Sequence, residues 1–207
     1  MQTTIKAVSL FACACLAAAS GFAAQTSEDD ARPYARVLAT VVQPTEDEAD
    51  AGCGALLELG ASAGQDAGWE AAFTTGWVGW EQTETFGGDV VEADADLYPL
   101  LLGIRYRIPL GRESPVHLAV GPAAGWTYSS ISGSATIDDI LYTASASRWN
   151  FTWGGEAALV FTLSSIDLVA GYKFLSTDAG EVTLDGVEYD LGSVDTHVFY
   201  AGLGWRW

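Results

Sequence analysis

Apolar residues recur at every second position in eight stretches of the chain, with small or polar residues between them. A two-residue period is typical of β-strands whose two faces meet different surroundings. In the last stretch, Trp207, Trp205 and Leu203 share one face, and Arg206 and Gly204 share the other. The pattern predicts strands at 34–43, 53–63, 69–81, 96–108, 116–128, 149–163 and 166–175, and a final strand ending at 207.

The connections between these strands alternate between short and long. Residues 64–68, 109–115 and 164–165 are short connections, whereas 44–52, 82–95, 129–148 and 176–195 are longer. An even number of strands, short turns at one end and long loops at the other are typical of a transmembrane barrel. The sequence therefore predicts an all-β fold, an eight-stranded antiparallel up-and-down transmembrane β-barrel.

Two long connections contain patterns of their own. Residues 182–189 alternate around a central Asp185-Gly186, a strong hairpin signal, and residues 135–142 show a weaker version. We expect both to extend the neighbouring strands as hairpins. Pro99 and Pro122 fall inside predicted strands. Proline removes a ladder donor, so we expect bulges at these positions.

Aromatic residues on the apolar face are regularly spaced. Trp69 and Trp77 are eight residues apart, and three further pairs share this spacing. At about 3.3 Å per residue and a tilt near 40°, eight residues rise roughly 20 Å, close to the apolar band between the aromatic girdles of a membrane barrel. The predicted girdle residues are Trp69, Trp77, Tyr98, Tyr106, Trp126, Trp153, Phe161 and Phe199.

The face opposite these aromatics carries isolated charges. The interior of an eight-stranded barrel is just wide enough to be filled by side chains. Unpaired charges buried there would be costly, so we expect them to form a salt-bridge network that fills the lumen. A narrow polar pore or gated channel is the alternative. The predicted network residues are Glu58, Glu70, Arg105, Arg107, Glu156, Lys173 and Arg206.

The first residues have the features of an export signal. Lys6 precedes an apolar run at 7–19, and small residues at 21–24 offer a cleavage site. We therefore expect a signal peptide at 1–24, a short lead-in at 25–33 and a barrel domain at 34–207. The alternatives are a membrane anchor, for which the run is too short, and a lipoprotein lipidated at Cys13. After cleavage Cys53 is the one remaining cysteine, so no internal disulfide is expected.

Charge and residue types limit the possible chemistry. The formal net charge of −18 argues against nucleic-acid binding. Acidic residues gather in the long connections, where they form a solvated surface or hold divalent cations that bridge to anionic lipopolysaccharide.

We expect no cofactor and no metal, because two distant histidines and one mature cysteine make a poor zinc site. A pair of glycosidase carboxylates would need a cleft that a filled lumen lacks. His197, with Ser193 and Asp195 nearby in sequence, is interpreted as an interfacial histidine rather than part of a lipid-cleaving site. We therefore expect no catalytic residues.

The end of the chain resembles a known signal. Tyr200, Gly202, Trp205 and Trp207 are spaced like the C-terminal signal read by the outer-membrane barrel-assembly machinery. With the export signal and eight alternating strands, residues 34–207 resemble the small eight-stranded outer-membrane β-barrel families, the OmpA/OmpX-like porin-family barrels.

This resemblance implies a monomer in the outer membrane that contacts lipid and lipopolysaccharide, and the barrel-assembly machinery during biogenesis. The expected function is a non-enzymatic structural or surface-interaction role. A channel or transporter for small or hydrophobic solutes is the alternative. A lipid-modifying barrel enzyme is a third possibility, and a soluble ligand-binding barrel a fourth.

Overall fold

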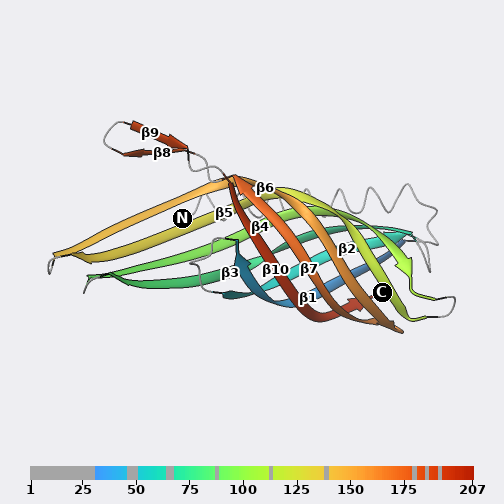
Figure 1. The fold of residues 1–207 in the computed structure, drawn as a ribbon. Helices are drawn as coiled ribbons and strands as arrows, with labels where there is room; N and C mark the ends of the chain where they lie inside the picture. The colour runs from blue at the N-terminus through green and yellow to red at the C-terminus, as the bar shows by residue number, and fades with distance from the viewer. Residues whose placement is uncertain are drawn as a thin grey trace.

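The computed structural model describes residues 31–45, 51–63, 68–86, 89–111, 114–137, 140–178, 181–184, 187–190 and 193–207. Eight strands form a closed antiparallel barrel in the order β1-β10-β7-β6-β5-β4-β3-β2 (Figure 1). The predicted fold is confirmed. The barrel strands are β1 (Ala31–Pro44), β2 (Gly52–Ala63), β3 (Gly68–Phe86), β4 (Asp89–Pro109), β5 (Val116–Ile137), β6 (Ile140–Leu163), β7 (Ile166–Asp178) and β10 (Ser193–Arg206). No helix within the described ranges is long and apolar enough to cross a membrane.

The last strand closes the barrel against the first. β1 and β10 pair continuously from Tyr34↔Arg206 to Pro44↔Thr196. The Trp207 backbone N–H also donates to the Pro33 carbonyl at 3.1 Å. At Gly202, an added Cβ would lie 2.0 Å from the Val37 carbonyl oxygen, so this close approach of β10 to β1 requires glycine.

Strand length divides the barrel into two sides. β3, β4, β5 and β6 have 19, 21, 22 and 24 residues, whereas β1, β2, β7 and β10 have 14, 12, 13 and 14. The β2–β3 ladder ends at Cys53↔Gly79, but the β3–β4 ladder continues to Phe86↔Asp89. The β5–β6 ladder likewise runs to Ile137↔Ile140. Residues 80–86, 89–96, 129–137 and 140–151 therefore form a four-stranded extension, here called the projecting sheet, which reaches beyond the barrel in Figure 1.

The projecting sheet corrects two predicted loops. Residues 82–95 and 129–148 were expected to be long connections, but all of their described residues are strand. The alternation of apolar and polar residues fades there, because the sheet has left the barrel wall and no longer has one face toward lipid. The weaker hairpin expected at 135–142 is confirmed as the tip of β5 and β6.

The hairpin expected around Asp185-Gly186 is present as β8 (Glu181–Leu184) and β9 (Val187–Asp190). These strands pair with each other in a separate two-stranded sheet rather than in the barrel sheet. The expectation that they extend β7 and β10 is therefore wrong. The turn residues 185–186 lie outside the described residues.

The bulges expected at the prolines are absent from the described ladders. The β3–β4 ladder passes from Thr75↔Leu100 to Val78↔Leu97 without a change of register, and Pro99 lies in the interruption. The β4–β5 ladder behaves in the same way opposite Pro122. On one side of each proline the neighbouring strand forms no bridge: β3 beside Pro99 and β4 beside Pro122. The missing N–H is accommodated at these interruptions, so no residue needs to be inserted. Gly76, with φ 154°, adopts the backbone conformation that this interruption requires.

Candidate functional site in the barrel lumen

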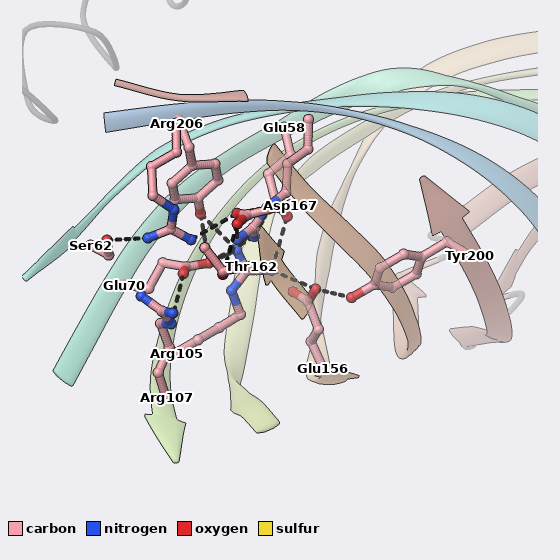
Figure 2. A network of polar contacts seen from close by, with 12 residues as sticks. Glu58, Ser62, Glu70, Arg105, Arg107, Glu156, Thr162, Asp167, Tyr200 and Arg206 are labelled. Atoms are coloured by element: carbon pink, nitrogen blue, oxygen red, sulfur yellow. Dashed lines mark hydrogen bonds and ion pairs between the residues drawn. The ribbon is translucent and has the colours of Figure 1, made fainter. Parts of the chain in front are cut away.

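Alternation along the strands turns one charged residue after another toward the barrel axis. Arg36 on β1, Glu58 on β2, Glu70 on β3 and Arg105 on β4 are all buried. The inward charges gather near the end of the barrel that carries the short turns, and Figure 2 shows them converging on one another. We refer to the buried charged residues of this half as the lumen network. Its members are Arg36, Glu58, Glu70, Arg105, Arg107, Glu156, Asp167, Lys173 and Arg206.

Arg105 is the centre of the lumen network. Its Nη1 donates to Glu156 Oε1 at 2.7 Å, and its Nη2 donates to Glu58 Oε1 at 2.7 Å. It also contacts Glu70 and donates to the Tyr34 hydroxyl oxygen at 2.7 Å. These partners lie on β1, β2, β3 and β6. One guanidinium therefore joins walls on different sides of the barrel.

Arg36 and Arg206 form a second group nearer the short turns. Arg36 Nη1 lies 2.8 Å from Glu58 Oε1 and 2.9 Å from Glu70 Oε1, and its Nη2 lies 2.9 Å from Asp167 Oδ2. Arg206 Nη2 lies 2.7 Å from the same Asp167 oxygen. The shared carboxylates connect this group to Arg105.

Lys173 and Tyr200 complete the network on the other side of Arg105. Lys173 Nζ lies 2.7 Å from Glu156 Oε2 and 3.8 Å from Glu58 Oε2. The Tyr200 hydroxyl donates to Glu156. Glu156 thus accepts hydrogen bonds from an arginine, a lysine and a tyrosine, which compensates for the loss of its hydration.

The charges in the network nearly balance. Five cations and four carboxylates are buried among the described residues. Arg107 is at the margin, with its Nε 3.8 Å from Glu70 Oε2. Removing either member of a buried pair leaves an uncompensated charge, which costs far more than an exposed pair contributes. The arrangement is therefore suited to holding the lumen closed.

The other half of the lumen combines apolar side chains with buried hydroxyl groups such as those of Thr127 and Thr152. Leu38 and Val42 are fully buried. A cavity of about 30 Å³ lies between this layer and Lys173. A buried water needs roughly 10–15 Å³ of such volume, so the cavity has room for about two or three water molecules. The apolar side chains at this cavity include Val42, Leu56, Val78, Leu97, Leu101 and Val198.

The seven residues predicted for the lumen all lie at inward, buried positions, and the structure brings them together with Arg107 at the edge. Sequence reasoning missed Arg36, Asp167 and Tyr34. Asp167 could have been found from alternation alone, since it follows the outward Ile166. Tyr200, which the sequence assigns to the insertion signal, is buried in the lumen, where its hydroxyl donates to Glu156.

The predicted girdle and insertion residues lie mainly on the outer surface. Seven of the eight girdle aromatics are exposed there, and Phe161 is half-buried. Trp205 and Trp207 are also exposed. Trp69 packs edge-on against Tyr106 with ring centroids 5.2 Å apart, and Trp126 packs in the same way on Phe151. The roles of these residues at the membrane interface and in insertion stay predictions.

His197 lies on the outer surface beside Tyr172. The Tyr172 hydroxyl and His197 Nδ1 are 2.7 Å apart, and the two rings stack with centroids 5.8 Å apart. Asp195 is bound at its backbone carbonyl by the Thr45 N–H and hydroxyl. No group of three or more His, Cys, Asp or Glu side chains in the described ranges is arranged to hold a metal ion.

Comparison with known proteins assigns this architecture to a family. The sequence matches the profile described as outer membrane protein beta-barrel domain over residues 11–206. The chain belongs to this family. It is therefore an outer membrane protein, and the predicted localisation is confirmed. No curated protein sequence matches the chain.

Two solved structures illustrate the shared fold. The attachment invasion locus protein Ail of Yersinia pestis is 16% identical, with a TM-score of 0.50 over 86% of this chain and 99% of the Ail chain. A major outer membrane protein from Thermus thermophilus is 15% identical, with a TM-score of 0.51 over 84% of this chain and 99% of that one. At these identities the likeness concerns the fold alone.

Proposed function

We propose that this protein is a non-conducting, non-enzymatic outer membrane barrel that anchors the projecting sheet at the cell surface for a structural or surface-interaction role. The observation that carries the proposal is the lumen network, in which Arg105 contacts carboxylates from β2, β3 and β6 across the barrel. A solute crossing the lumen would have to separate these pairs.

Energetics favour closure over gating. Breaking a buried ion pair by removing one partner costs roughly 3–5 kcal/mol. Arg105 holds three carboxylates at once, and two of them are shared with Arg36. Opening a path past Arg105 would break several of these contacts together. The network therefore supports a barrel that seals its lumen.

The projecting sheet supports the surface-interaction part of the proposal. Short turns face the periplasm in outer membrane barrels, so the long strands β3–β6 extend into the medium. The barrel fold is also that of Ail, whose name describes attachment and invasion, although the low identity means that the fold alone is shared. We expect lipopolysaccharide and outer membrane lipid around the barrel wall and the barrel-assembly machinery as a partner during biogenesis.

The alternative, a transporter of small or hydrophobic solutes, would use the half of the lumen where apolar and threonine side chains line the cavity. Its cavity of about 30 Å³ has room for only a few water molecules, and Lys173 forms part of its lining. A lipid-modifying enzyme would need His197 paired with a nucleophile and an acid, whereas its described ring-nitrogen partner is the Tyr172 hydroxyl. Neither alternative explains why four carboxylates and five cations are buried together.

Liposome swelling tests the proposal. Vesicles containing the mature protein should swell in small sugars no faster than protein-free vesicles. Vesicles with the double variant Glu58→Ala/Arg105→Ala should swell faster, because two side chains at the centre of the network are removed. Swelling by the unaltered protein at a porin-like rate would overturn the proposal.

A further inference from the structure

The projecting sheet has two edges without a described partner strand, residues 140–151 of β6 and residues 80–86 of β3, and the second of these borders a groove. β3 pairs with β2 up to Gly79, and beyond it residues 80–86 pair with β4 on one side. No described strand pairs with their other side. An open edge offers a row of backbone donors and acceptors and is a template for a further strand.

A surface groove begins where this edge becomes free. It has a volume of about 630 Å³, and its lining includes Cys53, Trp77, Glu81, Asp94, Asp96 and Ser132. These residues come from β2, β3, β4 and β5. The groove therefore crosses the sheet beside the open edge rather than lying within one loop.

The groove is strongly acidic because three carboxylates lie on the same face of the paired strands β3 and β4. Glu81 and Asp94 are direct cross-strand partners, and Asp96 faces Gly79 on the next rung of the same face. Like charges directly opposite each other destabilise a sheet pair. Trp77 partly compensates by donating from Nε1 to Asp96 Oδ1 at 2.7 Å. The described residues that line the groove include no cation to offset the three carboxylates.

The exposed Trp77 ring adds a second recognition element. Its side chain remains exposed on the groove wall. The face of an indole attracts ammonium and guanidinium groups. An aromatic wall, three carboxylates and an unpaired backbone edge together fit a cationic, extended chain.

We propose that this groove and the 80–86 edge bind a basic extended peptide segment of a partner protein, which adds to the projecting sheet as a strand beside β3. The inference rests on the proposed surface-interaction function and names the class of partner. Side chains on one face of a strand repeat about every 6.6–6.8 Å, as do the carboxylates along β4. The partner segment should therefore carry Lys or Arg at every second position.

A second copy of this chain fits the edge poorly. Each chain carries a formal net charge of −18, so two copies repel each other at low salt. Pairing two β3 edges would also bring their Glu81 residues close together. Charged edge strands of this kind are a common protection against self-pairing.

Titration calorimetry with a ten-residue peptide of alternating Arg and Thr tests the proposal, with the mature protein in nanodiscs of zwitterionic lipid. We expect one peptide per barrel, with binding that weakens as salt is raised. The variant Glu81→Gln/Asp94→Asn/Asp96→Asn should bind at least about tenfold more weakly, since it removes the three groove charges. The matched control Glu181→Gln/Glu188→Gln/Asp190→Asn, which removes three charges from β8 and β9, should change the affinity less than about twofold.

A second peptide separates strand addition from simple charge attraction. The same sequence N-methylated at every residue keeps its charge but cannot pair along an edge, so its binding should be lost. Equal binding of both peptides, equal weakening by both triple variants, or no binding at all would overturn the proposal. A dimer in sedimentation that the peptide does not dissociate would also overturn it, in favour of a second copy.

The liposome swelling assay on the same protein keeps the two proposals apart. If the peptide does not bind but the vesicles do not swell, only the proposed class of partner is overturned. Rapid swelling overturns the proposed anchor function whatever the peptide does.

Discussion

The lumen network and the projecting sheet both concentrate charged side chains, but the first pairs opposite charges and the second places like charges side by side. In the lumen, Glu58 and Glu156 are buried, and they contact three and two cations respectively. On the sheet, Glu81 and Asp94 are exposed and face each other as like charges. The first arrangement satisfies its charges internally, as a structural plug does. The second leaves a charge unmatched, as a binding surface does.

The largest effect is expected from Arg105→Ala. Three carboxylates and Tyr34 would lose their common partner in a buried site. The free energy of unfolding should fall by about 3–5 kcal/mol. Urea unfolding in detergent micelles, followed by tryptophan fluorescence, measures this change. The exposed Arg32→Ala is the control and should stay within about 0.5 kcal/mol of the unaltered protein.

A double-mutant cycle on Glu156 and Lys173 comes next. Their contact of 2.7 Å is buried, so Glu156→Gln or Lys173→Met alone takes from the other residue its nearest charged partner. We expect a coupling energy of about 1–3 kcal/mol, with the double variant more stable than the sum of the singles predicts. Additive effects would mean that the pair does not act as a unit in the folded barrel.

Steric substitution at Gly202 should have a smaller effect. Its added Cβ would lie 2.0 Å from the Val37 carbonyl oxygen, at the seam between the first and last strands. Gly202→Ala should lower the free energy of unfolding by about 1–3 kcal/mol through backbone displacement. Gly103→Ala is a matched control, because its added Cβ meets atoms no closer than 3.6 Å. Equal losses at the two sites would contradict the tight seam.

The smallest effect has the opposite sign. Asp94→Asn removes one of two like charges that face each other on the projecting sheet. The free energy of unfolding should rise by about 0.2–1 kcal/mol at low salt, and the gain should shrink as salt is added. Loss of stability would mean that Asp94 has a structural partner, and the contrast between sheet and lumen would fail there.

Most of the fold could be predicted from sequence because a barrel wall imposes a strict two-residue period. The face toward lipid carries apolar residues such as Trp69 and Leu102, and the face toward the narrow lumen carries charged residues such as Glu70 and Arg105. The same logic placed seven charges at inward positions. The sequence did not reveal Arg36, because its strand β1 carries apolar residues on both faces and this hides the two-residue period.

The projecting sheet and the partner choices in the lumen could not be predicted in the same way. Outside the membrane neither face must be apolar, so the extensions of β3 to β6 carry weak alternation and resemble loops in sequence. Which carboxylate meets which cation depends on register and barrel closure. Arg36 and Asp167 are 131 residues apart, and only the pairing of β1 with β10 and of β10 with β7 brings them together.

Single-channel recording in planar bilayers tests the closed lumen most directly. The protein should give no stable openings across the voltage range that the bilayer tolerates, whereas Glu58→Ala/Arg105→Ala should give discrete steps. Stable, frequent openings of the unaltered protein would contradict the account, because ions would then pass through a lumen that Arg105 and its carboxylates are held to close.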